Sequence, residues 1–216
     1  MYAWVLLAAL AAVALADWFA VATGRRGVEQ VAKPAYVVLL GAFAWLLHAD
    51  ETVSGLWLLM GLALCLGGDL LLLAESDRAF GFGLVTFLLA HVAFIGAVMT
   101  MSRRPPVWVG VAVVVVVVVA VVVAFVLWPL ARRDMAEGLP PTIYAFVLGA
   151  FVAVAWWSGQ LLVGIGASLF LVSDGLLALG RFWRELPGLP VAVMVTYHLA
   201  LLFLVLGVLR PDLVAP

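Results

Sequence analysis

The sequence predicts an all-α membrane protein, with eight transmembrane helices in one bundle. Of its 216 residues, 68% are hydrophobic and only 11% are charged, and the mean hydropathy is +1.27. A soluble domain of this length carries far more charge. Continuous apolar runs of about 20 residues, the length of a membrane-spanning helix, recur along the chain. Because apolar and polar residues do not alternate within these runs, a transmembrane β-barrel is not expected.

The predicted spans follow from the apolar runs and from the residues that interrupt them. Proline is tolerated in the first turn of a helix, because the N–H that it lacks would have no partner there, so KPAY is taken to open the second helix. The valine run at 113–119 is helical in lipid, where the backbone must satisfy its own hydrogen bonds. The loops are short, so residues 1–216 are expected to form one domain. The predicted helices cover residues 2–22, 34–48, 55–74, 79–101, 107–130, 141–157, 160–180 and 190–209.

The basic residues predict the orientation in the membrane, because cytoplasmic loops carry an excess of lysine and arginine. One side holds only Arg103, Arg104 and Arg210. Both termini are therefore expected outside a bacterial-type plasma membrane. The basic residues expected on the cytoplasmic side are Arg25, Arg26, Lys33, Arg78, Arg132, Arg133, Arg181 and Arg184.

Composition also limits the partners. The net charge of −1 gives no reason to expect a nucleic-acid partner. Cys65 is the single cysteine of the chain, which excludes an internal disulfide and a multi-cysteine metal site. No cofactor is expected, the lipid bilayer is the expected environment, and the oligomeric state is left open.

Two aspartates lie within apolar helices, Asp69 in ALCLGGDLLLLAE and Asp174 in ASLFLVSDGLLALG. At a rise of about 1.5 Å per residue, they lie about 8 Å and about 9 Å from the cytoplasmic ends of their helices. A carboxylate at this depth costs roughly 2.5–3.5 kcal/mol, so each must face the bundle interior or water. Two neighbouring acids in a low dielectric do not both ionise easily, so one keeps its proton and the pair suits acid/base catalysis.

Other polar residues are expected in the same half of the membrane. Asp17, His198 and His91 lie about 8 Å, about 12 Å and about 18 Å from the cytoplasmic ends of their helices. Tyr197 adjoins His198, and Lys33 lies at the cytoplasmic mouth. Taken singly, each residue has a structural alternative, such as a contact between helices or, for Lys33, a position at the membrane surface. Taken together, they indicate a site.

A repeated pattern links the third and fourth helices to the seventh and eighth. A glycine precedes each aspartate by eight residues, at Gly61 and Gly166. Each aspartate is followed by a histidine on the next helix, 22 residues later in the first case and 24 in the second. The two hairpins are therefore predicted to be parallel copies of one unit.

Five segments, taken in order, resemble the YhhN-like lysoplasmalogenase family: KPAY, GGDLLLL, FGFGLVTFLLAHVAF, LFLVSDGLLAL and MVTYHLALL, between residues 33 and 202. The resemblance implies an eight-helix membrane enzyme that cleaves the vinyl-ether bond of lysoplasmalogens, releasing a fatty aldehyde and glycerophosphoethanolamine or glycerophosphocholine. It implies catalytic acids at Asp69 and Asp174, with Lys33 and His91 also in the site. The chain departs from the family pattern in the last helix, where His198 replaces a second aromatic residue and Leu201 replaces a glutamine.

The chemistry of vinyl-ether hydrolysis agrees with these residues. The β-carbon takes a proton, water adds to the resulting oxocarbenium ion, and the hemiacetal collapses to aldehyde and alcohol. One neutral carboxylic acid and one carboxylate suit these steps, and Asp69 and Asp174 are the candidates, with either assignment of roles open. Arg25, Arg26 and Arg78 are further candidates to hold the lipid phosphate. The residues expected to bind substrate are Lys33, His91, Tyr197 and His198.

Two other functions are consistent with the same residues. Asp69, His91, Asp174 and His198 are the side-chain types of a zinc site, which would make the protein a zinc-dependent lipid hydrolase. Paired acids and histidines at one depth also suit a proton-coupled transporter of a small molecule or lipid.

Overall fold

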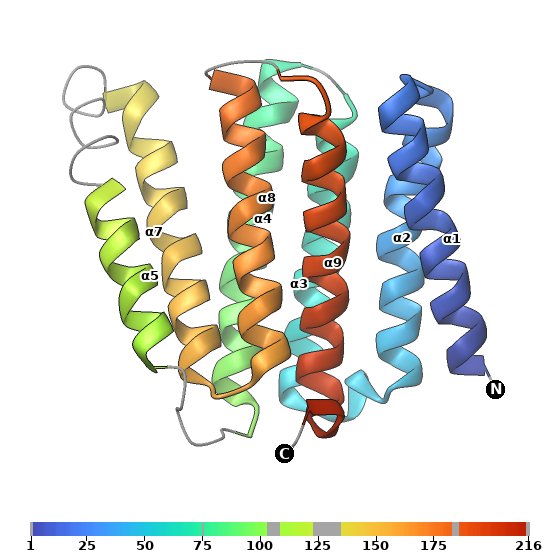
Figure 1. The fold of residues 1–216 in the computed structure, drawn as a ribbon, viewed down its shortest axis with the longest axis vertical. Helices are drawn as coiled ribbons and strands as arrows, with labels where there is room; N and C mark the ends of the chain where they lie inside the picture. Colours follow the sequence, from blue (N-terminus) through green and yellow to red (C-terminus); the bar gives the residue numbers. More distant parts are fainter. Residues whose placement is uncertain (1, 75, 103–108, 123–134, 183–185, 215–216) are drawn as a thin grey trace.

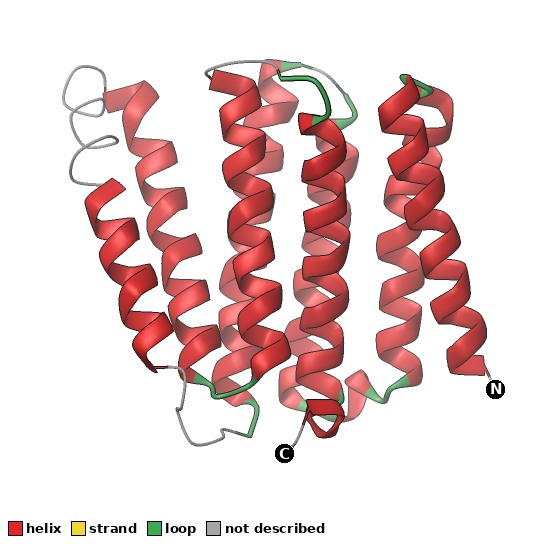
Figure 2. Cartoon of the chain, in the orientation of Figure 1, coloured by secondary structure: helices red, strands yellow, loops and turns green. Residues whose placement is uncertain are grey.

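The computed structural model describes all residues except 1, 75, 103–108, 123–134, 183–185 and 215–216. The described residues form helices, turns and loops, and contain no strand (Figure 2). Two short 3₁₀ helices, η1 (Ala49–Glu51) and η3 (Pro211–Val214), accompany the longer ones. The α-helices are α1 (Tyr2–Thr23), α2 (Arg26–Leu46), α3 (Val53–Leu72), α4 (Asp77–Thr100), α5 (Val109–Val122), α7 (Met135–Trp157), α8 (Leu161–Phe182) and α9 (Leu189–Leu209).

The helices run up and down beside one another, and both ends of the chain lie at the same end of the bundle (Figure 1). Helices α3 and α4 pack closely together, as do α8 and α9, while α1–α2 and α5–α7 form the two outer pairs. Six helices among the described residues are long and apolar enough to cross a membrane. The chain is therefore a multi-pass membrane protein, as predicted.

The count of eight spans stays a prediction. Helix α2 carries Arg26, Glu29 and Lys33 in its first turns, and the described part of α5 is only 14 residues long. The end of the predicted fifth helix, residues 123–130, lies outside the described residues. The assignment of residues 1–216 to one domain and the duplication of the two hairpins likewise stay predictions.

Two predicted helix starts were wrong, and both concern proline. Helix α2 begins at Arg26 and continues through Pro34, and α7 begins at Met135 and continues through Pro140 and Pro141. An internal proline loses one backbone hydrogen bond, but contacts with neighbouring helices offset this loss in a membrane bundle. The longer α2 turns the Lys33 side chain into the interior, where only 5% of the residue is exposed.

Other helix starts follow from side-chain caps. Thr52 accepts a hydrogen bond from the Gly55 N–H at 3.0 Å and begins α3. Ser76 accepts one from the Ala79 N–H at 3.1 Å and begins α4. Each cap satisfies an N–H group that has no partner within its helix. The observed starts, Val53 and Asp77, lie within two residues of the predicted ones.

Glycines allow α3 and α4 to approach each other. A Cβ atom on Gly61 would lie 2.3 Å from the ring of Phe94, and one on Gly68 would lie 2.6 Å from the ring of Phe87. Small residues at such positions let membrane helices pack closely. Because Gly68 directly precedes Asp69, this packing also sets the position of the first buried carboxyl group.

We expect Gly61→Ala to lower the free energy of unfolding by about 1–3 kcal/mol, because the added methyl group collides with a buried ring. The matched control is Gly41→Ala, since a Cβ at Gly41 meets nothing within 4 Å. That control should leave stability unchanged or raise it by up to about 1 kcal/mol. Thermal unfolding of both variants in detergent checks the prediction, and equal stability of the two would contradict this packing.

Candidate active site

Three helices meet at the carboxyl group of Asp69, which is only 1% exposed. The hydroxyl of Tyr197 on α9 donates a hydrogen bond to Asp69 Oδ2 at 2.8 Å. The Nζ atom of Lys33 on α2 lies 3.8 Å from Asp69 Oδ1. A cation and a hydroxyl donor therefore both face this carboxyl group, and together they stabilise it as a carboxylate.

Asp174 has different partners. The hydroxyl of Tyr144 on α7 donates to Asp174 Oδ2 at 2.5 Å, and Nε2 of His91 on α4 lies 3.8 Å from the same oxygen. No lysine or arginine of the described chain pairs with Asp174. Its side chain is 13% exposed, whereas that of Asp69 is almost completely covered. The two acids therefore lie in different electrostatic surroundings.

Aromatic side chains link the two acids. The Phe170 ring lies 4.6 Å from the His91 ring and 5.5 Å from the Tyr197 ring, measured between centroids. The buried Cys65 thiol lies within electrostatic reach of both Asp69 and Asp174. The two carboxyl groups thus belong to one buried region, although neither donates a hydrogen bond to the other.

The pairs cross between the two predicted hairpins. Asp69 on α3 pairs with Tyr197 on α9, and Asp174 on α8 pairs with His91 on α4. Each hairpin therefore supplies an acid to a partner on the other. The site therefore depends on how α3–α4 packs against α8–α9.

His198 belongs to a third group, with residues of α1 and α2. Its Nε2 atom lies 3.8 Å from Asp17 Oδ2, and its Nδ1 accepts a hydrogen bond from Trp18 Nε1 at 3.0 Å. The Tyr36 ring stacks on the imidazole with centroids 4.0 Å apart, and its hydroxyl donates to the His198 carbonyl at 2.7 Å. His198 therefore pairs with Asp17, and neither Asp69 nor Asp174 is its partner.

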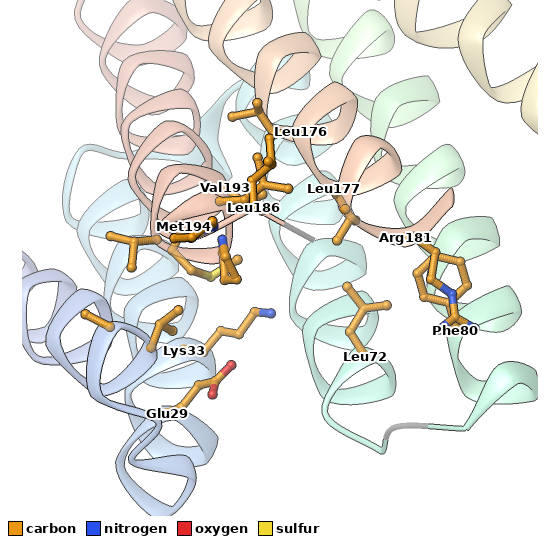
Figure 3. Close-up of a pocket in the computed structure, with 18 residues that line it drawn as sticks. Glu29, Lys33, Leu72, Phe80, Leu176, Leu177, Arg181, Leu186, Val193 and Met194 are labelled. Carbon is orange, nitrogen blue, oxygen red and sulfur yellow. The ribbon is translucent and has the colours of Figure 1, made fainter. Parts of the chain in front are cut away.

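A cleft of about 890 Å³ lies at the end of the bundle where α1 turns into α2 and α8 into α9. Its wall is largely apolar, with Leu72 and Leu176 among its residues, and Glu29, Lys33 and Arg181 supply charge. Figure 3 shows Glu29 and Lys33 both pointing into this space. Because Lys33 also reaches Asp69, it joins the cleft to the buried acids.

The residues proposed for a zinc ion do not assemble. The described residues contain no group of three or more His, Cys, Asp and Glu side chains that could hold a metal ion. His91 pairs with Asp174, and His198 pairs with Asp17. The geometry of the described residues therefore does not fit the predicted zinc ligands.

Sequence reasoning missed several partners of the acids. Tyr144, Tyr36 and Trp18 were not predicted as site residues, yet each contacts a buried acid or histidine. The tyrosines could have been predicted from the sequence, because the chain has only four of them. A tyrosine in the middle of an apolar helix needs a partner for its hydroxyl, and three of the four make such bonds in the site.

The sequence profile of the YhhN family matches residues 28–208. The chain belongs to the YhhN family. It is 33% identical over 190 residues to a lysoplasmalogenase of Mycobacterium tuberculosis, covering 86% of this chain and 72% of that relative. It is 29% identical over 188 residues to the mouse lysoplasmalogenase TMEM86B, covering 85% and 76%. The human lysoplasmalogenase TMEM86B is 30% identical over 178 residues, covering 81% and 72%.

The resemblance predicted from the sequence is thus confirmed, and the relatives of this YhhN family member are ether hydrolases by name. No solved structure matches the chain significantly. The matched residues include Lys33, Asp69, His91 and Asp174, whereas Asp17 lies before them.

A double-mutant cycle tests the pair of Lys33 and Asp69. We expect Lys33→Met to lower the free energy of unfolding by about 3 kcal/mol, because it leaves a buried carboxyl group without its cation. The double variant with Asp69→Asn should lose less, since no uncompensated charge remains. Thermal unfolding in detergent is measured for the wild type, the two single variants and the double variant. If the stability losses of the two single variants add up to that of the double variant, the two side chains do not interact.

Proposed function

We propose that this YhhN family member is a membrane-embedded lysoplasmalogenase. It cleaves the vinyl-ether bond of lysoplasmalogens to a fatty aldehyde and glycerophosphoethanolamine or glycerophosphocholine. The observation that carries the proposal is the unequal pair of buried acids: Asp69 lies beside the Lys33 ammonium group, whereas Asp174 contacts Tyr144 and His91 and pairs with no lysine or arginine among the described residues. The names of the relatives supply the substrate class.

The surroundings of the two acids suggest their roles. Asp69 lies beside a cation and suits the carboxylate that stabilises positive charge and activates water. Asp174 faces uncharged groups and suits the neutral acid that donates a proton. His91 and Tyr197 hold the two carboxyl groups in place, and Tyr144 does the same for Asp174.

The proposed reaction proceeds in three balanced steps. Asp174 gives its proton to the β-carbon of the vinyl ether, which forms an oxocarbenium ion next to the Asp69 carboxylate. Water then adds to the α-carbon and loses a proton to Asp69, giving a hemiacetal. Finally the carbon–oxygen bond to glycerol breaks, the glycerol oxygen takes the proton held by Asp69, and the hemiacetal hydroxyl returns a proton to Asp174 as the aldehyde forms.

The cleft suits a lysophospholipid. Its apolar wall accommodates the hydrocarbon chain, and its charged residues suit a zwitterionic headgroup. Arg181 and Lys33 would attract the phosphate, and Glu29 the amine. This end of the bundle carries the described basic residues of the predicted cytoplasmic loops, so the proposal places it in the cytoplasm and the termini outside.

Aldehyde release from a defined lysoplasmalogen by purified protein tests the proposal directly. We expect Asp69→Asn and Asp174→Asn each to reduce kcat by about 10²–10⁴, because each removes a proton-transfer group. Glu51→Gln is the control, since this exposed carboxylate pairs with His48 at the opposite end of the bundle. Folded wild-type protein that releases no aldehyde would refute the proposal and direct attention to proton-coupled transport.

Headgroup preference tests the role of Glu29. We expect Glu29→Gln to raise the KM for a lysoplasmalogen with an ethanolamine headgroup roughly tenfold, equivalent to about 1.4 kcal/mol, because the amine loses its counter-ion. The KM for the same lipid with a phosphoglycerol headgroup, which has no amine, should stay the same. Equal changes in KM for both lipids would show that Glu29 does not bind the amine.

A further inference from the structure

Asp17, in the last two turns of α1, is a buried acid that the reaction does not use. The residue is 0% exposed, and neither carboxyl oxygen has a hydrogen-bond partner among the described residues. An ionised carboxylate without donors is strongly unfavourable in the interior of a membrane protein. Such a group keeps its proton or relies on a nearby cation.

The charged and titratable groups that face Asp17 come from three helices. His198 on α9 lies 3.8 Å away, and Lys33 and Glu29 on α2 and Asp69 on α3 act on it electrostatically. Because His198 Nδ1 accepts a hydrogen bond from Trp18, the neutral imidazole must carry its hydrogen on Nε2, which faces Asp17. This neutral ring points an N–H group toward Asp17 without forming a hydrogen bond, and it brings no positive charge.

Lys33 is therefore the cation available to two acids. It lies 3.8 Å from Asp69, and its charge also acts on Asp17 and on His198. It is the one lysine or arginine among the described residues that is less than 9% exposed. One positive charge balances one carboxylate, and a second carboxylate in the same low-dielectric space would be uncompensated. Two acids and one lysine thus form a neutral group only when one acid holds a proton.

We propose that Asp17 and Asp69 share Lys33 and hold a single proton between them, carried by Asp17 while Asp69 acts as the carboxylate. Asp17 is then a positioning residue, because it acts on the reaction through the ionisation of Asp69. The assigned role of Asp69 rests on the proposed function, whereas the shared proton rests on the burial of Asp17, the 3.8 Å approach of Lys33 to Asp69 and the action of the Lys33 charge on Asp17. Asp17 also lies outside the residues matched by the family profile.

Infrared spectroscopy of the purified protein at neutral pH counts protonated carboxyl groups through their C=O stretching bands. We expect Asp17→Asn to remove one band. Asp69→Asn should also remove one band although Asp17 is still present, because Lys33 is then free to compensate an ionised Asp17. Lys33→Met should add one band, since both acids must then be protonated. Lys33→Arg keeps the charge and should leave the count unchanged.

Two controls identify the bands. Asp174→Asn removes the band of Asp174, and that band should persist in all Lys33 variants. Glu51→Gln changes an exposed carboxylate and should alter no band. A band of Asp17 that persists in Asp69→Asn, or an unchanged count in Lys33→Met, would overturn the proposal. If Asp69→Asn does not fold, Lys33→Met still tests the shared proton from the opposite direction.

The measurement needs no substrate, so it separates this inference from the proposed function. Bands that respond as expected in a protein that releases no aldehyde would refute the function and retain the shared proton. If the protein releases aldehyde but its C=O bands do not change in Lys33→Met, the function is retained and the shared proton is refuted.

Discussion

The ammonium group of Lys33 is a positive charge held inside a membrane protein, and much of the site depends on it. Its Nζ atom lies 3.8 Å from Asp69, and the side chain also lines the cleft that opens at one end of the bundle. A lone charge at this depth would be costly, so the carboxyl group beside it contributes to the stability of the fold. The long α2 helix makes this possible, because it carries Lys33 into the interior one residue before Pro34.

The remaining architecture gives each acid its own partners. Glycine contacts bring α3 against α4, and the crossed pairs connect that hairpin to α8 and α9. The Phe170 ring contacts the rings of both His91 and Tyr197, with centroids 4.6 Å and 5.5 Å away. Two aspartates with similar sequence surroundings therefore meet different electrostatic environments, which suits the different roles proposed for them.

Much of this was predictable from the sequence, because lipid imposes strong rules. Continuous apolar runs indicated helices, and a carboxylate within such a run indicated an inward-facing group, so Asp69, Asp174, His91 and Tyr197 were identified together. Which side chains pair with each other was harder to predict, because the depth of a residue in the membrane does not tell which helices are neighbours. His198 was expected beside Asp69 and Asp174, but α1 packs against α9, and His198 pairs with Asp17 instead. The start of α2 was wrongly predicted at Pro34 for a similar reason. Contacts with neighbouring helices offset the hydrogen bond that the proline loses, and the helix continues through it.

The location of the cleft affects where each product of the proposed reaction goes. It lies where the helices turn, next to the membrane surface, and its wall is apolar except for Glu29, Lys33 and Arg181. In the proposed reaction, the headgroup fragment is soluble in water and leaves through this end, whereas the long-chain aldehyde remains dissolved in the lipid. An opening at this end would therefore sort the two products into different phases and deliver the soluble one to one side of the membrane.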